Sequence, residues 1–141
     1  MLTNRSVPPC TVIPTLHYPD PAIAAEWLCA AFGFTIRLRI GNHRIQMRAG
    51  DGCFVIHEGQ LPEPGSAAFA IHSIMVRVPD AETHCEHARQ HGATITTPPT
   101  DHMYGERQYN AVDFAGHRWT FTQSIADIDP ASWGGEPIHI E

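Results

Sequence analysis

Short stretches of the chain alternate apolar and polar residues, and two longer stretches between them have the spacing of amphipathic helices. Residues 11–34, TVIPTLHYPDPAIAAEWLCAAFGF, contain an alternating segment, a Pro-Asp turn and a helical pattern that stops at Gly33. Residues 71–94, IHSIMVRVPDAETHCEHARQHGAT, repeat this plan and stop at Gly92. We expect Asp20 and Asp80 to accept hydrogen bonds from the first helical turn, and the glycines to end each helix.

Further strand patterns follow each predicted helix, so each half of the chain predicts the order β-α-β-β-β. The segments are residues 34–40, 43–50 and 53–59 in the first half, and 93–97, 107–114 and 117–123 in the second. The Gly-, Pro- and Ala-rich residues 59–68 predict a linker. We therefore expect one domain over residues 1–141, with module one at about 11–58, module two at about 69–123 and a C-terminal tail at 124–141.

Alternation within a strand assigns its residues to two faces, one in the core and one opposite to it. The residues predicted to be buried are Val12, Leu16, Phe54, Ile56, Ile74, Val76, Val78, Trp119 and Phe121. Those predicted to lie on the opposite face are Ile13, Thr15, His17, Cys53, Val55, His57, Ser73, Met75, Arg77, Arg118, Thr120 and Thr122.

The paired modules and three motifs, YPD with FGF, VPDAETHCEHARQHGATI and YGERQYNAVDFAGHRWTF, resemble the vicinal-oxygen-chelate superfamily. This superfamily includes glyoxalase I, bleomycin-resistance proteins and extradiol dioxygenases, and the likeness, greatest to its small glyoxalase-like branch, covers residues 11–123. It implies an α+β fold in which two βαβββ modules form a curved mixed sheet, with a concave cleft and helices on the convex face. It also implies a homodimer.

The same resemblance locates the family's metal ligands in the first and last strands of each module. Counting from the Pro-Asp turns and the last glycine turn, these positions are Ile13, Ser73 and Thr120, none of which is a good divalent ligand. His57 lies near a ligand position, and His17 could complete an alternative pair. We therefore expect no cofactor, and a divalent metal is the disfavoured alternative.

The segment HMYGERQY gathers polar and aromatic groups around a glycine that permits a tight bend. Loops on a rigid scaffold often carry binding groups, and the resemblance likewise puts this loop beside the cleft. We expect ligand contacts from His102, Tyr104, Glu106 and Arg107, the alternative being an ion pair between Glu106 and a nearby arginine. The following DFAG segment predicts a turn in which Asp113 bonds the turn amides.

Composition limits the class of protein. With 43% hydrophobic and 17% charged residues and a net charge of −6, the chain has the profile of an ordinary globule and no basic nucleic-acid footprint. No apolar stretch reaches the ~18 residues of a membrane span, and no signal peptide pattern is present. Cys10, Cys29, Cys53 and Cys85 are far apart and mostly within apolar segments, so we expect reduced thiols and a cytoplasmic protein without nucleic-acid or membrane partners.

These observations favour a protein that binds a small aromatic or polar organic molecule in a metal-free cleft. The expected contacts are His17, His57, Met75, Arg77, His102, Tyr104, Glu106, Arg107, Arg118 and Thr120, and no catalytic residue is assigned. The alternatives are a metal-dependent glyoxalase-like lyase or isomerase, a ring-cleaving dioxygenase, a metal-free acid/base enzyme and a regulatory module. Fold does not supply function, so the sequence names no substrate.

Overall fold

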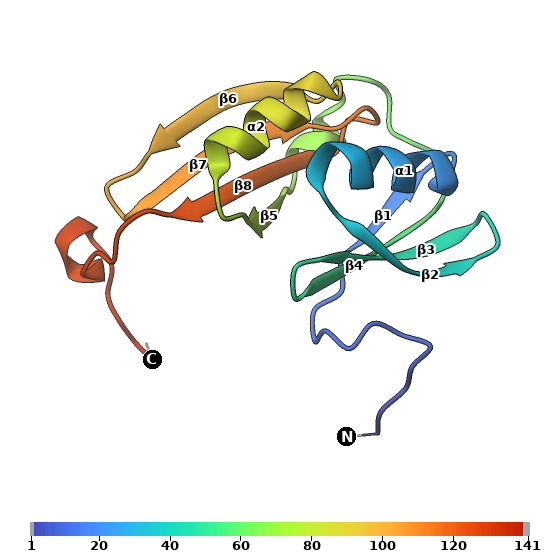
Figure 1. Ribbon diagram of the computed structural model, residues 1–141, viewed down its shortest axis with the longest axis horizontal. Helices are drawn as coiled ribbons and strands as arrows, with labels where there is room; N and C mark the ends of the chain where they lie inside the picture. Colours follow the sequence, from blue (N-terminus) through green and yellow to red (C-terminus); the bar gives the residue numbers. More distant parts are fainter. Residues whose placement is uncertain (1, 140–141) are drawn as a thin grey trace. The chain divides into compact units, whose positions relative to one another are not determined.

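The computed structural model describes residues 2–139, which form two compact units, one up to Ala68 and the other from Phe69 on (Figure 1). The first unit contains β1 (Thr15–Tyr18), α1 (Pro21–Phe32), β2 (Thr35–Ile40), β3 (Arg44–Ala49) and β4 (Gly52–Glu58). Its four-stranded sheet has the order β1-β4-β3-β2, with β1 parallel to β4 and the other pairs antiparallel.

The second unit repeats this topology. It contains β5 (Ile74–Arg77), α2 (Ala81–Gln90), β6 (Thr94–Asp101), β7 (Glu106–Val112) and β8 (Arg118–Ser124). The sheet order is β5-β8-β7-β6, again with a single parallel pair, β5 with β8. Two short 3₁₀ helices flank the module, η1 (Ala67–Ala70) and η2 (Pro130–Trp133). The α+β class and the two βαβββ modules predicted from the sequence are confirmed.

Both helices begin where the sequence predicts. The carboxylate of Asp20 accepts from Ile23 N at 3.2 Å, and that of Asp80 accepts from Thr83 N at 3.1 Å, so each satisfies an amide of the first turn. Gly33 ends α1 with a φ of 79°, in the left-handed region that favours glycine. The α2 helix ends at Gln90, one residue before its cap.

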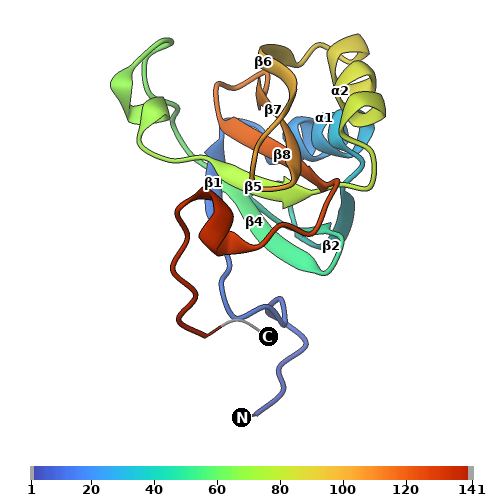
Figure 2. The same cartoon turned by 90° about the vertical axis from the view of Figure 1, so that its left-hand side faces the viewer.

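Each sheet buries one face against its own helix, and α2 lies along β6, β7 and β8 (Figure 1, Figure 2). The largest buried side chains of the second unit are Trp119, Tyr109 and Phe121, which alternate with less buried neighbours, as predicted for Trp119 and Phe121. Fully burying side chains of this size stabilises the fold by roughly 1.5–3 kcal/mol each.

One predicted core residue of the first strand is wrong. Val12 is 77% exposed, whereas Leu16 is buried. The strand begins only at Thr15, since Pro14 has no amide to donate to a ladder and the chain before it leaves the sheet.

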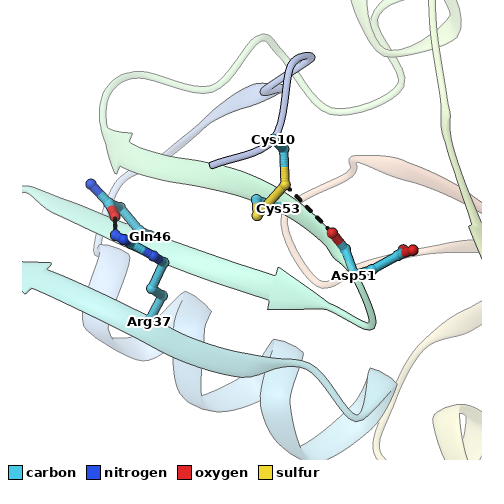
Figure 3. The surroundings of a disulfide bond; sticks show 5 residues. All are labelled: Cys10, Arg37, Gln46, Asp51 and Cys53. Atoms are coloured by element: carbon cyan, nitrogen blue, oxygen red, sulfur yellow. Dashed lines mark hydrogen bonds between the residues drawn. A yellow bond between two sulfur atoms is a disulfide. The ribbon is translucent and has the colours of Figure 1, made fainter. Parts of the chain in front are cut away.

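The four cysteines do not all remain thiols, which corrects the prediction of reduced cysteines. Cys10 and Cys53 form a disulfide that joins the N-terminal segment to β4 (Figure 3), whereas Cys29 and Cys85 are free. Burial raises the pKa of the Cys85 thiol. The cytoplasmic location was predicted partly from reduced thiols. Because disulfides are rare in the cytosol, the Cys10–Cys53 disulfide removes that argument. No helix among residues 2–139 is long and apolar enough to cross a membrane.

Candidate ligand site

The second unit has a hollow of about 460 Å³ on the sheet face opposite α2. Its lining comes from the residue before β5 and from β6, β7 and β8, namely Ser73, Thr96, Thr97, Asn110, Ala111, Val112, Arg118, Trp119 and Thr120. A volume of this size lies within the range of small-molecule sites.

Strand alternation explains why this face is polar. Trp119 and Phe121 point into the core beneath α2, so Thr120 between them points to the opposite face. Asn110 lies opposite Thr120 in the β7–β8 ladder, and Ala111 beside it is buried. The sheet thus presents polar side chains over a packed aromatic layer that fixes their positions.

Two polar side chains at the centre of the hollow bond to each other. The hydroxyl of Thr120 donates to Asn110 Oδ1 at 2.7 Å. Within residues 2–139, Asn110 Nδ2 has no hydrogen-bond partner, so it can donate to a bound molecule. Arg118 is exposed at the rim, and Met75, 61% exposed, is aligned with Thr120 on the neighbouring strand. Donors therefore meet apolar surface here, a combination suited to an organic molecule with acceptor atoms.

A row of hydrogen bonds continues along the same face beyond the hollow. Thr122 donates to Glu106 at 2.7 Å and accepts from Gln108 Nε2 at 3.1 Å. Arg77 donates to Ser124 and lies 3.6 Å from Glu106. Hydrogen bonding from Ser124 and then from Thr122, together with the charge of Arg77, lowers the pKa of Glu106. Glu106 is thus held as an anion, and the ion pair with an arginine that the sequence offered as an alternative is present.

The turn before β7 is shaped by Gly105. Its φ is 87°, and an added Cβ would clash with the carbonyl oxygen of Ala126, so only glycine fits. Beside it, the rings of His102 and Tyr104 stack with centroids 5.0 Å apart. Tyr104 also lies 5.1 Å from the ring of Trp133 in η2, and its hydroxyl donates to Gln108. These aromatics form a cluster outside the lining of the hollow.

Arg107 does not share a sheet face with Glu106, its neighbour among the predicted ligand contacts. The adjacent Glu106 faces the polar row, so alternation directs Arg107 to the α2 face. There it makes a two-pronged ion pair with Asp101, with Nε 2.6 Å from Oδ1 and the terminal nitrogen 3.1 Å from Oδ2. A ligand contact by Arg107 stays a prediction.

His17 and His57 lie in the first unit, directly opposite each other in the parallel β1–β4 pair. Their ring centroids are 4.1 Å apart in an edge-to-face arrangement. Burial, and then the positive field of His17 and Arg44, lowers the pKa of His57. The sequence therefore correctly placed these two side chains together, whereas their ligand role stays a prediction.

The metal that the fold family implies needs several anionic or imidazole donors around one point. Ser73 and Thr120, which occupy two of the expected ligand positions, both line the hollow and offer only hydroxyls. Across residues 2–139, no group of three His, Cys, Asp or Glu side chains is arranged to hold an ion. The donor set in the hollow does not fit a divalent metal.

Sequence reasoning missed part of the lining. Thr96, Thr97, Asn110 and Val112 were not singled out, because their placement depends on strand register and on a bulge in β6. The signal that could have found Asn110 is its position between Tyr109 and Ala111, two apolar residues of an alternating strand.

Comparison with known proteins gives the family. The family model of the glyoxalase/bleomycin resistance protein/dioxygenase superfamily matches residues 12–121. TioX from Micromonospora sp. ML1 is 30% identical with a TM-score of 0.66, over 85% of this chain and 100% of that chain. The fosfomycin resistance protein FosX from Mesorhizobium loti is 16% identical with a TM-score of 0.62, over 82% and 92% respectively.

A glyoxalase/bleomycin resistance protein/dioxygenase family enzyme from Burkholderia phytofirmans PsJN is 12% identical with a TM-score of 0.62, over 78% of this chain and 94% of that chain. The likenesses below 25% identity show the fold alone. The comparison with curated protein sequences gave no significant match. The family model and TioX together establish that the chain belongs to the glyoxalase/bleomycin resistance protein/dioxygenase superfamily.

Proposed function

We propose that this protein binds a small organic molecule in the hollow of its second unit. The observation that carries the proposal is the central Asn110–Thr120 pair, which leaves Asn110 Nδ2 as a free donor above buried aromatic rings. Binding and sequestration of a molecule need no catalytic group. The hydroxyl and amide donors of the hollow match that role better than they match acid/base or metal chemistry.

A ligand screen on the full chain tests the proposal. Neutral and anionic aromatic compounds are screened by ligand-observed NMR, and hits are repeated with Ser73→Trp, which fills the hollow from its exposed edge. The matched control is Thr94→Trp, at an exposed position of the same sheet outside the lining. We expect hits that Ser73→Trp abolishes and Thr94→Trp retains. Hits that survive Ser73→Trp would locate the site elsewhere, and a screen without hits would refute the proposal.

The proposal extends to assembly. We infer a homodimer because the family resemblance implies one. Sedimentation equilibrium gives the mass in solution against the chain mass of 15.6 kDa. Twice that mass is expected, and a monomer at all concentrations would contradict the homodimer.

A further inference from the structure

The two modules share their register around one bulge, and β6 has a second register shift, between Thr97 and Thr100, that β2 lacks. In unit one Arg37 is the bulged residue of β2, between Ile36 and Leu38, and in unit two Thr96 is the bulged residue of β6, between Ile95 and Thr97. Leu38 pairs with Gln46, and Thr97 pairs with Asn110. The ladders therefore make Arg37 equivalent to Thr96, and Gln46 equivalent to Asn110. Continuing across to the next strands, Cys53 is equivalent to Arg118 and Val55 to Thr120.

In unit one these positions are covered by the chain itself. We call residues Arg5–Cys10 the strap. Arg37 donates to the carbonyl of Arg5 at 2.9 Å, and Gln46 Nε2 donates to the carbonyl of Ser6 at 2.8 Å. Pro8 of the strap is buried. Figure 3 shows the strap end at Cys10 above β4, with the Arg37–Gln46 hydrogen bond on the neighbouring strands.

The equivalent positions of unit two form the hollow. Thr96, Asn110, Arg118 and Thr120 all line it. In unit one Gln46 Oε1 accepts from the neighbouring Arg37, which leaves its amide nitrogen for the strap carbonyl. In unit two Asn110 Oδ1 likewise accepts from Thr120, which leaves its amide nitrogen for whatever enters the hollow. A side-chain amide nitrogen thus lies at the equivalent point of both modules. That of Gln46 donates to a peptide carbonyl, whereas that of Asn110 is open to the hollow.

We propose that the hollow takes a small peptide-type molecule, one of whose amide carbonyls accepts from Asn110 Nδ2 as the Ser6 carbonyl accepts from Gln46. This proposal rests on the proposed function and names its ligand class. The other groups of the lining agree with it, because the hydroxyls of Ser73 and Thr96 and the guanidinium of Arg118 are further donors for carbonyl or carboxylate oxygens. Val112 supplies apolar surface for side chains.

The test compares two uncharged probes on the full chain. One is the capped tripeptide acetyl-Val-Pro-Pro-amide, which has the sequence of strap residues 7–9. The other is 1-N-phenylnaphthylamine, an aromatic molecule without a carbonyl. Both are titrated into ¹⁵N-labelled protein, and the backbone amides of β5, β7 and β8 report occupancy of the hollow. The tripeptide is expected to shift these amides.

The decisive variant is Asn110→Asp, which keeps the acceptor for Thr120 and replaces only the free donor by an acceptor. We expect it to weaken tripeptide binding about tenfold and to change phenylnaphthylamine binding less than twofold. Gln90→Asp, on the exposed outer side of α2, adds the same charge and is the matched control, with both affinities unchanged. Amide spectra of each variant confirm that it is folded.

The outcomes separate this inference from the broader proposal. A hollow that binds phenylnaphthylamine but not the tripeptide overturns the peptide-type ligand and leaves small-molecule binding intact. Tripeptide binding that Asn110→Asp does not weaken, or tripeptide shifts confined to unit one, also overturns it. If neither probe shifts the amides of the hollow, this inference fails, and the wider aromatic screen with Ser73→Trp then decides the proposed function.

Discussion

Replacing Asp113 with alanine is expected to destabilise the second unit and to loosen the layer beneath the hollow. Asp113 is only 4% exposed and holds the turn between β7 and β8. Its Oδ1 accepts from the amides of Ala115 and His117, each at 3.0 Å. Its Oδ2 accepts from the indole nitrogen of Trp119 at 3.1 Å. One carboxylate therefore orders the turn and fixes a residue that lines the hollow.

The magnitude follows from the environment of each donor. Trp119 is 1% exposed, so its orphaned indole N–H cannot turn to water and costs about 1–3 kcal/mol. The amides of Ala115 and His117 lie in partly exposed residues and regain water, so each costs about 0.5 kcal/mol. The expected loss in free energy of unfolding is about 2–4 kcal/mol. Asp113→Asn keeps one oxygen, which can accept from the turn amides or from the Trp119 indole but not from both. Its loss in free energy of unfolding should therefore be smaller than that of Asp113→Ala.

Urea denaturation measures this loss as a lower midpoint with an unchanged slope. Asp127→Ala, at an exposed position of the C-terminal tail, is the matched control and should change the free energy of unfolding by less than about 0.5 kcal/mol. Asp113→Ala within about 0.5 kcal/mol of wild type would refute the assignment of Asp113 as the group that fixes Trp119.

Three further predictions concern the strap, the polar row and the α2 face. Under oxidising conditions, Cys10→Ser should lower the free energy of unfolding by about 2–4 kcal/mol, because the disulfide closes a 43-residue separation; equal stability of wild type and variant would contradict a stabilising role of the Cys10–Cys53 disulfide. Glu106→Gln should destabilise at pH 7 and lose its effect in acid: the pKa of Glu106 is lowered in the folded chain, so its ionised form contributes stability above the ordinary pKa of 4.5 that disappears as pH falls through the lowered pKa. Paired urea titrations at pH 7 and pH 3 check this, and a constant difference would be evidence against it. Arg107→Ala should leave ligand affinity in the hollow unchanged, because Arg107 lies on the α2 face, and should alter the melting temperature little, because its partner Asp101 is exposed; reduced affinity, read by calorimetry, would contradict this and support the ligand contact predicted from the sequence.

The fold could be predicted because its sequence signals act over a few residues. Asp20 and Asp80 act on amides three residues away, and alternation around Trp119 and Phe121 follows from strand geometry alone. Because both signals lie within a few residues of the chain, the sequence is enough to read them, and their repetition predicts the paired modules.

The hollow and the strap depend on contacts that are distant in sequence. Cys10 meets Cys53 because the N-terminal segment crosses the sheet. The spacing of the cysteines in the sequence does not predict this path. Thr96 and Asn110 become neighbours only through the bulge and the β6–β7 register. Glu106 and Arg107 were both predicted as ligand contacts, but β7 begins at Glu106, so alternation directs the two side chains to opposite faces.

The most direct test of the central claim is a crystal structure of the full chain soaked with the tightest hit from the ligand screen. The account predicts electron density for the compound in the hollow of the second unit, with an acceptor atom within hydrogen-bond distance of Asn110 Nδ2. Density only on another surface, or an empty hollow at saturating compound, would contradict it.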